Sequence, residues 1–479
     1  MTSWSPDKCW NEECGVFAVV GVPRASEITA LGLHALQHRG QEATGIVSCD
    51  DRGDFHVRKG IGLVSDVYDS GNLNDLPGQL AIGHNRYSTA GGLTLENTQP
   101  LRVVYRGGPL ALAHNGNLTN AAALRQSLEE SGSIFQTTLD TEVFLHLVAL
   151  AQTDDVEAAL AEAARAVTGA YSIVVLARGK VIAMRDPHGF RPLCVGRLGD
   201  GYVVASETCA LDLVGADFIR EVEPGEMITI DPQGMRARRA VAAAEPPQHC
   251  IFEHIYFSRP DSRVFGATVD QVRRKLGHQL AREHPVAADV VIAVPDSSNS
   301  IALGFAEESG TRFELGLIRN HYVGRTFIQP QQAGRDFGVR VKFNPVREVL
   351  DGKRVVVVDD SIVRGTTSRK LVRLLRRSGA REVHFRVGSP PVTHPCFYGI
   401  DTPSRRELIG ALKTVDEIRE YLGVDTLGYL SLDGMLACES EPRRFCRACF
   451  DGRYPVAVEA GAGKLAIEHL RRAPSGSGA

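Results

Sequence analysis

Near its start the chain carries a cysteine and a glycine, Cys14-Gly15, at the head of the apolar run GVFAVV. A thiol is a nucleophile, and acyl transfer from an amide needs a nucleophile, a base and a site for the oxyanion. A cysteine at a free N-terminus would bring its own base, because an α-amine titrates near about 7.7–8.0. Within a peptide that nitrogen cannot accept the proton, so this chemistry predicts removal of residues 1–13. A buried apolar thiol is the alternative for Cys14 considered alone.

A second stretch, RVVVVDDSIVRGTTS (354–368), combines two carboxylates with a glycine–threonine loop. The apolar run predicts a buried strand that ends at Asp359 and Asp360, followed by a short loop and a helix. The loop offers backbone N–H groups, two hydroxyls and a helix N-terminus, all suited to a phosphate. The carboxylates suit sugar hydroxyls and a bridging Mg²⁺. A plain strand followed by a capped helix is the alternative.

The third group is FCRACF, which places Cys446 and Cys449 at C-x2-C spacing. That spacing alone is compatible with zinc, with an iron–sulfur cluster or with no metal, and two more ligands would be needed. Ten cysteines in 479 residues do not form a disulfide scaffold. Reduced thiols, metal ligands or catalysis therefore explain them better.

Two kinds of sheet are expected to position these groups. The first half of the chain has short strand-like runs with Gly and Asn turns, which predict antiparallel sheets. These runs are CGVFAVVG, LALAHNGNL, YSIVVLARGKVIAMRD and GYVVASE. Helical patterns lie between them, at 28–38, 119–131 and 140–167, and sheets with segregated helices predict an α+β layered domain. The segment 231–249 is expected to be a last turn followed by a linker.

The second half alternates short Val- and Ile-rich runs with helical patterns, notably 366–379, which predicts a buried parallel sheet. The expected strands are 289–296, 314–320, 354–360 and 382–390. Ligands bind beyond the carboxyl ends of such strands, where Asp359 and Asp360 would lie. The last residues, APSGSGA, are typical of a disordered tail.

The length and the net charge of the chain limit which classes of protein it can belong to. A chain of 479 residues exceeds one ordinary core, so two domains are expected. A net charge of −3 gives no electrostatic case for nucleic acid or an anionic membrane. No apolar stretch is long enough to span a bilayer, and the N-terminus lacks the pattern of a secretion signal. These features favour the cytoplasm.

The stretch 354–368 resembles the loop of type I phosphoribosyltransferases that binds phosphoribosylpyrophosphate (PRPP). VPDSSNSIALGFA resembles their pyrophosphate-binding turn, with Ser297 where a residue meets Mg²⁺, although PDSSNS replaces a more glycine-rich turn. RNHYVGRTFIQP and VRVKFN resemble the mobile loop that closes over PRPP, with His321 where members commonly carry Arg. The resemblance implies PRPP contacts at Lys342, Asp359, Asp360, Arg364, Gly365, Thr366 and Thr367, and Mg²⁺ ligands at Ser297, Asp359 and Asp360.

The first half resembles the glutaminase domain of amidotransferases with an N-terminal cysteine nucleophile. The motifs are CGVF (14–17), LQHRGQEATGI (36–46), GHNRYSTAG (83–91), AHNGNL (113–118) and LDTE (139–142). In this order the two halves resemble the glutamine PRPP amidotransferase (amidophosphoribosyltransferase) family, bacillus-type, over almost the full length. The resemblance implies a propeptide (1–13), an αββα N-terminal-nucleophile glutaminase domain (14–235), a type I phosphoribosyltransferase domain with a parallel sheet (236–472) and a tail (473–479).

The same resemblance assigns the glutamine site. Cys14 is the nucleophile, and the Asn115 side chain with the Gly116 backbone N–H matches the oxyanion hole. Arg86 matches the residue that pairs with the α-carboxylate of glutamine, and Asp140 the one that takes its α-amino group. Each residue has an ordinary alternative: a hairpin turn for Asn115-Gly116, a surface cation for Arg86 and a helix N-cap for Asp140, which could serve both roles.

Two distant cysteines complete the third group. Cys250 and Cys396 match the positions that, with Cys446 and Cys449, hold a [4Fe–4S] cluster in members of the family. The resemblance, and not the spacing, favours the cluster over zinc. Cys438 is a near neighbour without a family role. The cluster would tie three distant segments together, so we expect it to serve stability and not redox turnover.

The resemblance implies a reaction in two halves. Glutamine is hydrolysed at Cys14, and the ammonia travels inside the protein to C1 of PRPP, giving 5-phosphoribosylamine, glutamate and pyrophosphate in the first step of de novo purine synthesis. It also implies a homotetramer and feedback inhibition by purine nucleotides at 359–367. Two rivals are a PRPP- or nucleotide-binding paralogue acting as a sensor and an amidotransferase for another sugar phosphate. Cys14, Arg86 and the acid pair argue against the first, and the PRPP loop against the second.

Overall fold

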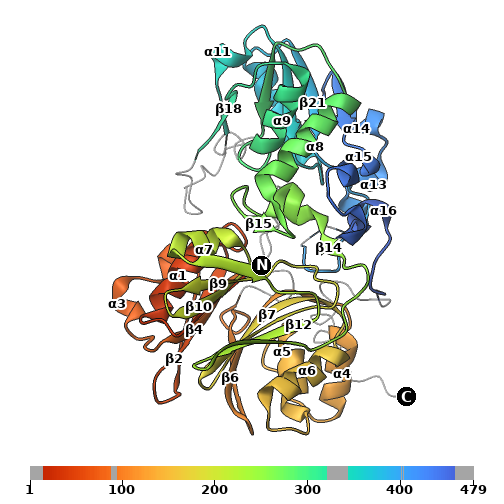
Figure 1. Cartoon of the computed structure of the whole chain (residues 1–479). Coiled ribbons are helices and arrows are strands. Elements are labelled where there is room, and N and C mark those ends of the chain that lie inside the picture. Colours follow the sequence, from red (N-terminus) through yellow and green to blue (C-terminus); the bar gives the residue numbers. More distant parts are fainter. Residues whose placement is uncertain (1–13, 88–93, 321–342, 401, 403, 459–479) are drawn as a thin grey trace, which may run out of the picture.

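The computed structural model describes most of the chain, namely residues 14–87, 94–320, 343–400, 402 and 404–458. Within these residues the N-terminal half forms the lower part of the molecule in Figure 1 and the C-terminal half the upper part. Four predicted features lie outside the described residues: the propeptide 1–13, His321, Lys342 and the tail 473–479.

The first half contains two antiparallel sheets. The seven-stranded sheet has the order β11-β9-β10-β1-β4-β2-β3 and the six-stranded sheet the order β13-β12-β8-β7-β6-β5. The strands of the first are β1 (Gly15–Val20), β2 (Ala43–Cys49), β3 (Phe55–Ile61), β4 (Leu80–Arg86), β9 (Cys194–Leu198), β10 (Gly201–Ala205) and β11 (Asp217–Glu221). Those of the second are β5 (Leu101–Tyr105), β6 (Gly108–Leu118), β7 (Gly169–Ala177), β8 (Lys180–Arg185), β12 (Glu226–Asp231) and β13 (Gly234–Arg239).

The two sheets pack face to face, with helices on the outer face of each. In β1, Val16 and Ala18 pack in the core between the sheets, whereas Phe17 and Val19 pack in the core under the helices. Successive side chains of a strand point to opposite faces, so a strand buried on both faces is a continuous apolar run. The outer helices are α1 (Ala25–Ala35), α2 (Val64–Val67), α3 (Ser70–Leu73) and α7 (Thr208–Val214) on one side, and α4 (Ala121–Glu130), α5 (Thr141–Leu150) and α6 (Val156–Ala166) on the other. The predicted αββα fold is confirmed.

The second half is built on a four-stranded parallel sheet. Its strands, in spatial order, are β17 (Val290–Ala293), β20 (Arg354–Asp359), β21 (Glu382–Val387) and β22 (Thr426–Tyr429). Helices α8 (Val269–Glu283) and α9 (Asn299–Ser309) pack on one face, and α12 (Thr366–Arg377) and α14 (Val415–Leu422) on the other. This agrees with the predicted parallel sheet.

Short elements complete the second half. The strands among them are β14 (His249–Cys250), β15 (Arg263–Val264), β16 (Ala267–Thr268), β18 (Leu317–Arg319), β19 (Phe343–Pro345) and β23 (Phe445–Cys446). The helices are the π-helix η1 (Glu253–Phe257), the 3-10 helices η2 (Arg405–Glu407) and η3 (Pro442–Arg444), and α11 (Arg347–Leu350), α13 (Ile409–Leu412), α15 (Leu432–Ala437) and α16 (Ala448–Asp451). Of these, β14 and β15 lie where the two halves meet (Figure 1), and β23 pairs with β14.

The expected strand 314–320 is not part of the parallel sheet. Its described strand, β18, pairs antiparallel with β19 instead, and only an isolated bridge joins Val291 to Phe313. Leu315 and Ile318 are 60% and 44% exposed, so the run lacks the two buried faces that a strand inside a parallel sheet needs.

Two other boundaries differ from the sequence prediction. The helical pattern 140–167 is two helices, α5 and α6, because Ala151 leaves the helical conformation and Asp155 caps the N-terminus of α6. The expected linker 231–249 contains β13, which pairs with β12 along its whole length. The first domain therefore extends through Arg239, and the boundary placed at 235 falls inside a strand.

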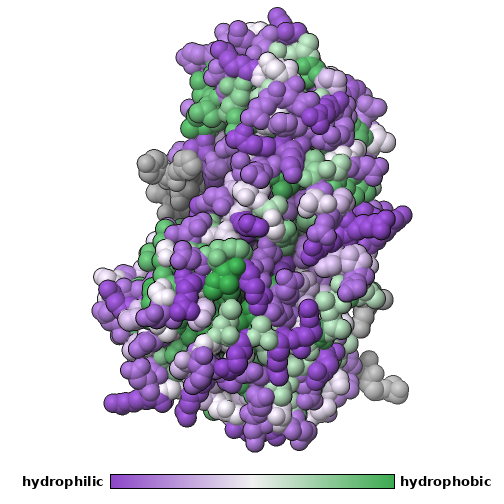
Figure 2. Space-filling view, viewed as in Figure 1, coloured by the Kyte–Doolittle hydropathy of each residue, from purple (hydrophilic) through white to green (hydrophobic). Residues whose placement is uncertain are grey.

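Apolar side chains are gathered mainly inside the molecule. Buried clusters occupy both faces of each main sheet. The face drawn in Figure 2 is mainly hydrophilic, with separate hydrophobic areas between the polar ones. None of the helices in the described ranges is both long and apolar enough to cross a membrane.

Candidate active sites

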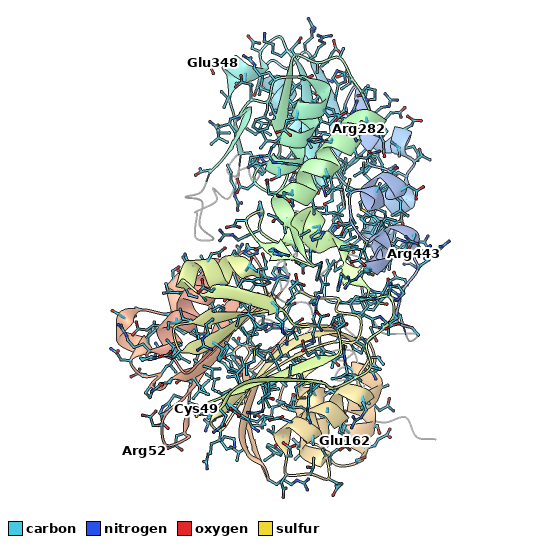
Figure 3. The ribbon with its side chains drawn as sticks, viewed as in Figure 1. Cys49, Arg52, Glu162, Arg282, Glu348 and Arg443 are labelled. Atoms are coloured by element: carbon cyan, nitrogen blue, oxygen red, sulfur yellow. The ribbon has the colours of Figure 1, made fainter. Side chains whose placement is uncertain are left out.

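Cys14 lies at the start of β1, at the end of the sheet that faces the second half. The residue is 8% exposed, and its thiol donates to the Tyr87 carbonyl at 3.5 Å. The Cys14 carbonyl accepts from Nε of Arg39 at 3.3 Å. The other end of this sheet carries Cys49, which Figure 3 shows far from the junction of the halves. Cys14 is buried, but it is held at a junction and not within a core cluster.

The following glycine allows a close approach behind the nucleophile. A Cβ at Gly15 would lie 3.2 Å from the Cβ of Leu36 and 3.6 Å from that of Arg39. Both residues follow α1, so the segment after that helix packs directly on the start of β1. The Cys-Gly pair thus brings Arg39 within reach of the Cys14 carbonyl.

Asn115 and Gly116 lie inside β6, opposite Ser172 and Tyr171, and not in a hairpin turn. Asn115 is buried, and its Nδ2 has no hydrogen-bond partner among the described residues. A buried donor without a partner lowers the stability of the fold by about 1–3 kcal/mol, so its presence calls for an explanation. A site that awaits an oxyanion supplies one, and Gly116 adjoins it with φ +148°.

Arg86 is the last residue of β4 and is 1% exposed, so the surface-cation alternative is wrong. Asp140 caps α5: one carboxylate oxygen accepts from the Thr141 N–H at 2.8 Å, and the other from the Leu118 N–H at 2.9 Å. Burial alone would raise the pKa of Asp140, but nearby His114 and these N–H groups outweigh it and lower the pKa. Asp140 is therefore the N-cap of α5, and its hydrogen bond with the Leu118 N–H joins that helix to the end of β6.

Two histidines connect these strands, although the sequence argument assigned them no role. His84 on β4 donates through Nε2 to the His114 carbonyl on β6 at 3.2 Å. Burial lowers the pKa of His84 to about 3, so its ring is neutral at physiological pH. His114 lies 3.2 Å from the Thr141 hydroxyl. Both lie in motifs quoted above for the glutaminase resemblance, GHNRYSTAG and AHNGNL, and those motifs could have indicated that the two histidines belong to the site.

The acid pair of the second half lies at the carboxyl end of β20, as predicted. Ser297 donates to Asp360 at 2.5 Å, and Ser298 donates to Asp359 at 3.3 Å. The turn after β17 therefore meets the acid pair. Burial raises the pKa of both carboxyls, and the adjacent Asp360 raises that of Asp359 further.

The phosphate loop has the predicted form of a strand, a loop and a helix. Gly365 has φ +72° at the N-cap of α12, and no side chain caps that helix end. Thr366 and Thr367 begin the helix, so its first N–H groups point toward the loop. The Arg364 guanidinium donates to Glu407 at 2.7 Å.

The predicted cluster ligands meet in one cavity. Pairing of β14 with β23 sets Cys250 opposite Cys446, and both line the cavity with Cys396 and Cys449. Burial raises the pKa of Cys446 to about 12 and that of Cys449 well above its ordinary value. Cys438 is elsewhere, since it donates to the Gly434 carbonyl within α15.

The donor set fits the group that the resemblance favours. Four thiols line the cavity, and four thiolates are the donor set of a [4Fe–4S] cluster and also of structural zinc. The cavity also has the buried Arg191 in its wall, a cation that would balance an anionic cluster.

Known proteins are similar to this chain. A family model described as a glutamine amidotransferase domain matches residues 84–213. The amidophosphoribosyltransferase of Bacillus subtilis is 51% identical over 458 residues, which cover 94% of this chain and 95% of that protein. Amidophosphoribosyltransferase 2, chloroplastic, of Arabidopsis thaliana is 54% identical over 448 residues, covering 93% and 80%.

Solved structures agree. A solved structure of the allosteric regulatory enzyme of purine biosynthesis superposes with a TM-score of 0.91 at 50% identity. The match covers 95% of this chain and 99% of the chain in that structure. The glutamine PRPP amidotransferase from B. subtilis complexed with ADP and GMP has a TM-score of 0.88 at 50% identity, with coverages of 93% and 98%.

Fold and relatives together define a glutamine amidotransferase joined to a phosphoribosyltransferase. The chain belongs to the amidophosphoribosyltransferase family, the enzymes of the first step of purine biosynthesis. The predicted family and enzyme class are confirmed, and none of these relatives supports the sensor alternative.

Proposed function

We propose that this chain hydrolyses glutamine at Cys14 and transfers the ammonia to C1 of PRPP, giving 5-phosphoribosylamine, glutamate and pyrophosphate. The amide donor of Asn115, buried beside Gly116 and without a partner among the described residues, carries the proposal. It is what a site for a tetrahedral oxyanion requires, and it has no use in a protein that only binds PRPP.

In the first half-reaction the Cys14 sulfur attacks the amide carbon of glutamine. Asn115 Nδ2 and the Gly116 N–H stabilise the oxyanion, ammonia leaves as a thioester forms, and water then releases glutamate. Arg86 and Asp140 hold the two charged groups of the substrate. The α-amine of Cys14 acts as the base, which requires removal of residues 1–13, a cleavage that remains a prediction.

In the second half-reaction ammonia displaces pyrophosphate at C1 of PRPP with inversion. The first turn of α12, at 365–367, holds the 5-phosphate, and the acid pair with Ser297 would hold Mg²⁺. Two adjacent carboxyls with raised pKa, one of them buried and the other half-buried, fit a cation that lets both ionise. The metal, when bound, would neutralise the leaving pyrophosphate. Lys342 is proposed as a further pyrophosphate contact.

We propose that Cys250, Cys396, Cys446 and Cys449 hold a [4Fe–4S] cluster with a structural role. The cluster, when bound, would join three segments far apart in the chain. Cys446→Ser should lower both the iron and acid-labile sulfide content and the midpoint of thermal unfolding, while Cys438→Ser changes neither. Wild-type protein that is stable and active without iron or sulfide would contradict this role.

Purine nucleotides are proposed as inhibitors at 359–367. They share a ribose phosphate with PRPP, and the structural relative from B. subtilis is a complex with ADP and GMP. Assembly as a homotetramer and a cytoplasmic location also remain proposals.

The decisive experiment measures glutamate and phosphoribosylamine formed from glutamine, PRPP and Mg²⁺. We expect Cys14→Ala to abolish use of glutamine while ammonium still serves as the nitrogen source. No glutamate release by the wild type, with or without PRPP, would reject the proposal. The intact mass of the active enzyme tests maturation: an active enzyme that retains residues 1–13 would disprove the α-amine as base.

A further inference from the structure

The glutaminase site is held by side chains of the second half, through a buried ion network. Arg39, whose Nε binds the Cys14 carbonyl, donates through its two terminal nitrogens to Glu253 at 3.0 and 2.6 Å. Glu253 belongs to η1 of the second half, and both side chains are fully buried. Arg39 also pairs with Glu207, which accepts from the Ser262 hydroxyl at 2.7 Å. The nucleophile is thus two contacts away from the other domain.

A second contact from the same domain reaches the oxyanion strand. The Asn117 side chain on β6 donates to the Phe397 carbonyl at 2.9 Å. Two residues further on, Gly399 adopts φ +110°, and a Cβ there would lie 3.1 Å from the Gly116 Cα. The segment 397–399 therefore packs its backbone against the residue whose N–H is proposed to bind the oxyanion.

Arg191 joins these two contacts into one network. It donates to the Tyr398 carbonyl through Nε at 2.9 Å and through a terminal nitrogen at 2.7 Å. Another terminal nitrogen lies 3.4 Å from Glu253. The side chain is fully buried, so water does not screen these interactions.

We infer that Glu253 and Asn117 are positioning residues for glutamine hydrolysis, through which the second domain fixes the nucleophile and the oxyanion donors relative to each other. The inference rests on the proposed function. Glu253 acts through Arg39 on the Cys14 backbone, and Asn117 acts on β6 beside Gly116. Neither touches the substrate.

The physical reason is that the two catalytic elements come from different sheets. β1 belongs to the seven-stranded sheet and β6 to the six-stranded sheet. The apolar core between those sheets fixes their spacing but tolerates small sliding, because apolar contacts have little directionality. Hydrogen bonds to one common partner, the second domain, set the relative position. A misplacement of 1 Å can cost about 10²-fold in rate.

The test compares Glu253→Gln and Asn117→Ala with Glu221→Ala. The control removes another bond between the halves, from the Gly266 N–H to Glu221 at 2.8 Å, and the longer pair of Glu221 with Arg185 at 3.8 Å. Neither partner lies on β1 or β6. We expect kcat for glutamine hydrolysis to fall about 10- to 100-fold in Glu253→Gln and about 10-fold in Asn117→Ala. KM for glutamine should change little, since Arg86 and Asp140 are untouched.

Two further readouts separate positioning from loss of folding. Ammonium-dependent synthesis from PRPP should remain at the wild-type rate in all three variants. The rate at which iodoacetamide alkylates Cys14, followed by mass spectrometry, should change in Glu253→Gln and not in Glu221→Ala. Asn117 is partly exposed, so we expect Asn117→Ala to fold. This variant tests the inference even where Glu253→Gln does not fold.

Wild-type kcat for glutamine in Asn117→Ala and in folded Glu253→Gln would overturn the inference, and so would an equal loss in Glu221→Ala. Failure of the proposed function looks different, because the wild type itself would then release no glutamate.

Discussion

The two sites differ in how their charges are balanced. In the glutaminase half, Asp140 receives two backbone N–H groups beside His114, and its pKa is lowered. In the transferase half, Asp359 is half-buried and the adjacent Asp360 is buried. Both are partnered mainly by serine hydroxyls, and their pKa values are raised. The first site is completed by the protein's own donors. The second holds two carboxyls whose negative charges the described protein groups do not balance, and the proposed Mg²⁺ would neutralise them.

The same contrast appears in the polar groups that lack a balancing partner within each site. In the glutaminase half, the Asn115 Nδ2 donor has no partner among the described residues, which suits the proposed binding of a charge that exists only during the reaction. The transferase half keeps two adjacent acids, for which a bound cation is proposed as the partner. Substitutions should therefore affect rate in the first half and stability in the second.

The largest effect is expected at Asn115. Asn115→Ala should lower kcat for glutamine hydrolysis by about 10²–10³-fold, equal to about 2.7–4 kcal/mol of barrier, with little change in KM. The free energy of unfolding should not fall by more than about 1 kcal/mol, because the substitution removes a buried donor that has no partner. Steady-state kinetics and urea denaturation measure the two quantities.

Asn117→Ala is the neighbouring comparison on β6, with a donor that is satisfied. A loss of stability in Asn115→Ala as large as its loss of activity would contradict the comparison, because Asn115 would then be a structural residue.

Asp359 should show the opposite behaviour. Its raised pKa means that the folded protein holds this proton more tightly than the unfolded chain, so stability falls as pH rises from about 3.9 through the folded pKa. Asp359→Asn lacks this loss and should be more stable than the metal-free wild type at pH 7.5 by about 1–3 kcal/mol. The advantage should vanish near pH 4 and shrink when Mg²⁺ is added at pH 7.5. Thermal unfolding across pH, with and without Mg²⁺, measures it.

Asp289→Asn is a control at the other end of the same sheet. The Arg354 side chain lowers the pKa of Asp289, so this carboxylate stabilises the fold above its unfolded pKa and loses that effect as pH falls. A stability gain in Asp359→Asn that does not vary with pH would refute buried charge as its cause.

The sequence was sufficient wherever one local pattern decides the structure. The acid pair after VVVV had to end a buried strand, and Gly365 had to precede a helix. It was insufficient where a decision depends on distant partners. The run 314–320 is apolar enough for a strand, but only the fold shows that it forms a separate ribbon with β19.

The network at the junction is the clearest case of what could not be predicted. Arg39, Arg191, Glu207 and Glu253 lie far apart in sequence, and each resembles an ordinary surface charge when it is considered alone. Burying a single charge is unfavourable, but here two arginines and two glutamates pair with one another between the domains, which offsets the loss of hydration. The cysteines could be grouped in advance because thiols are rare. Arg39 lies in the quoted motif LQHRGQEATGI, but charged residues are common, and nothing in the sequence indicates which of them it meets.

The smallest effect is expected for an exposed ion pair beside the acid pair. Arg319 lies 2.7 Å from Asp296, with side chains 51% and 50% exposed. Such pairs contribute about 0–1 kcal/mol, so Arg319→Gln should lower the free energy of unfolding by less than about 1 kcal/mol, and by nothing measurable in 1 M salt. Arg312→Gln, which breaks the exposed pair with Glu314, is the matched control.

Arg319→Gln should nevertheless raise KM for PRPP, and Arg312→Gln should not, because Asp296 lies in the turn that meets the acid pair. Breaking the buried pair at Glu253 should by contrast cost about 3–5 kcal/mol of stability. A loss above about 2 kcal/mol for Arg319→Gln would mean that the transferase site also depends on ion pairs between protein groups. The distinction between a site completed by the protein and a site completed by a cation would then fail.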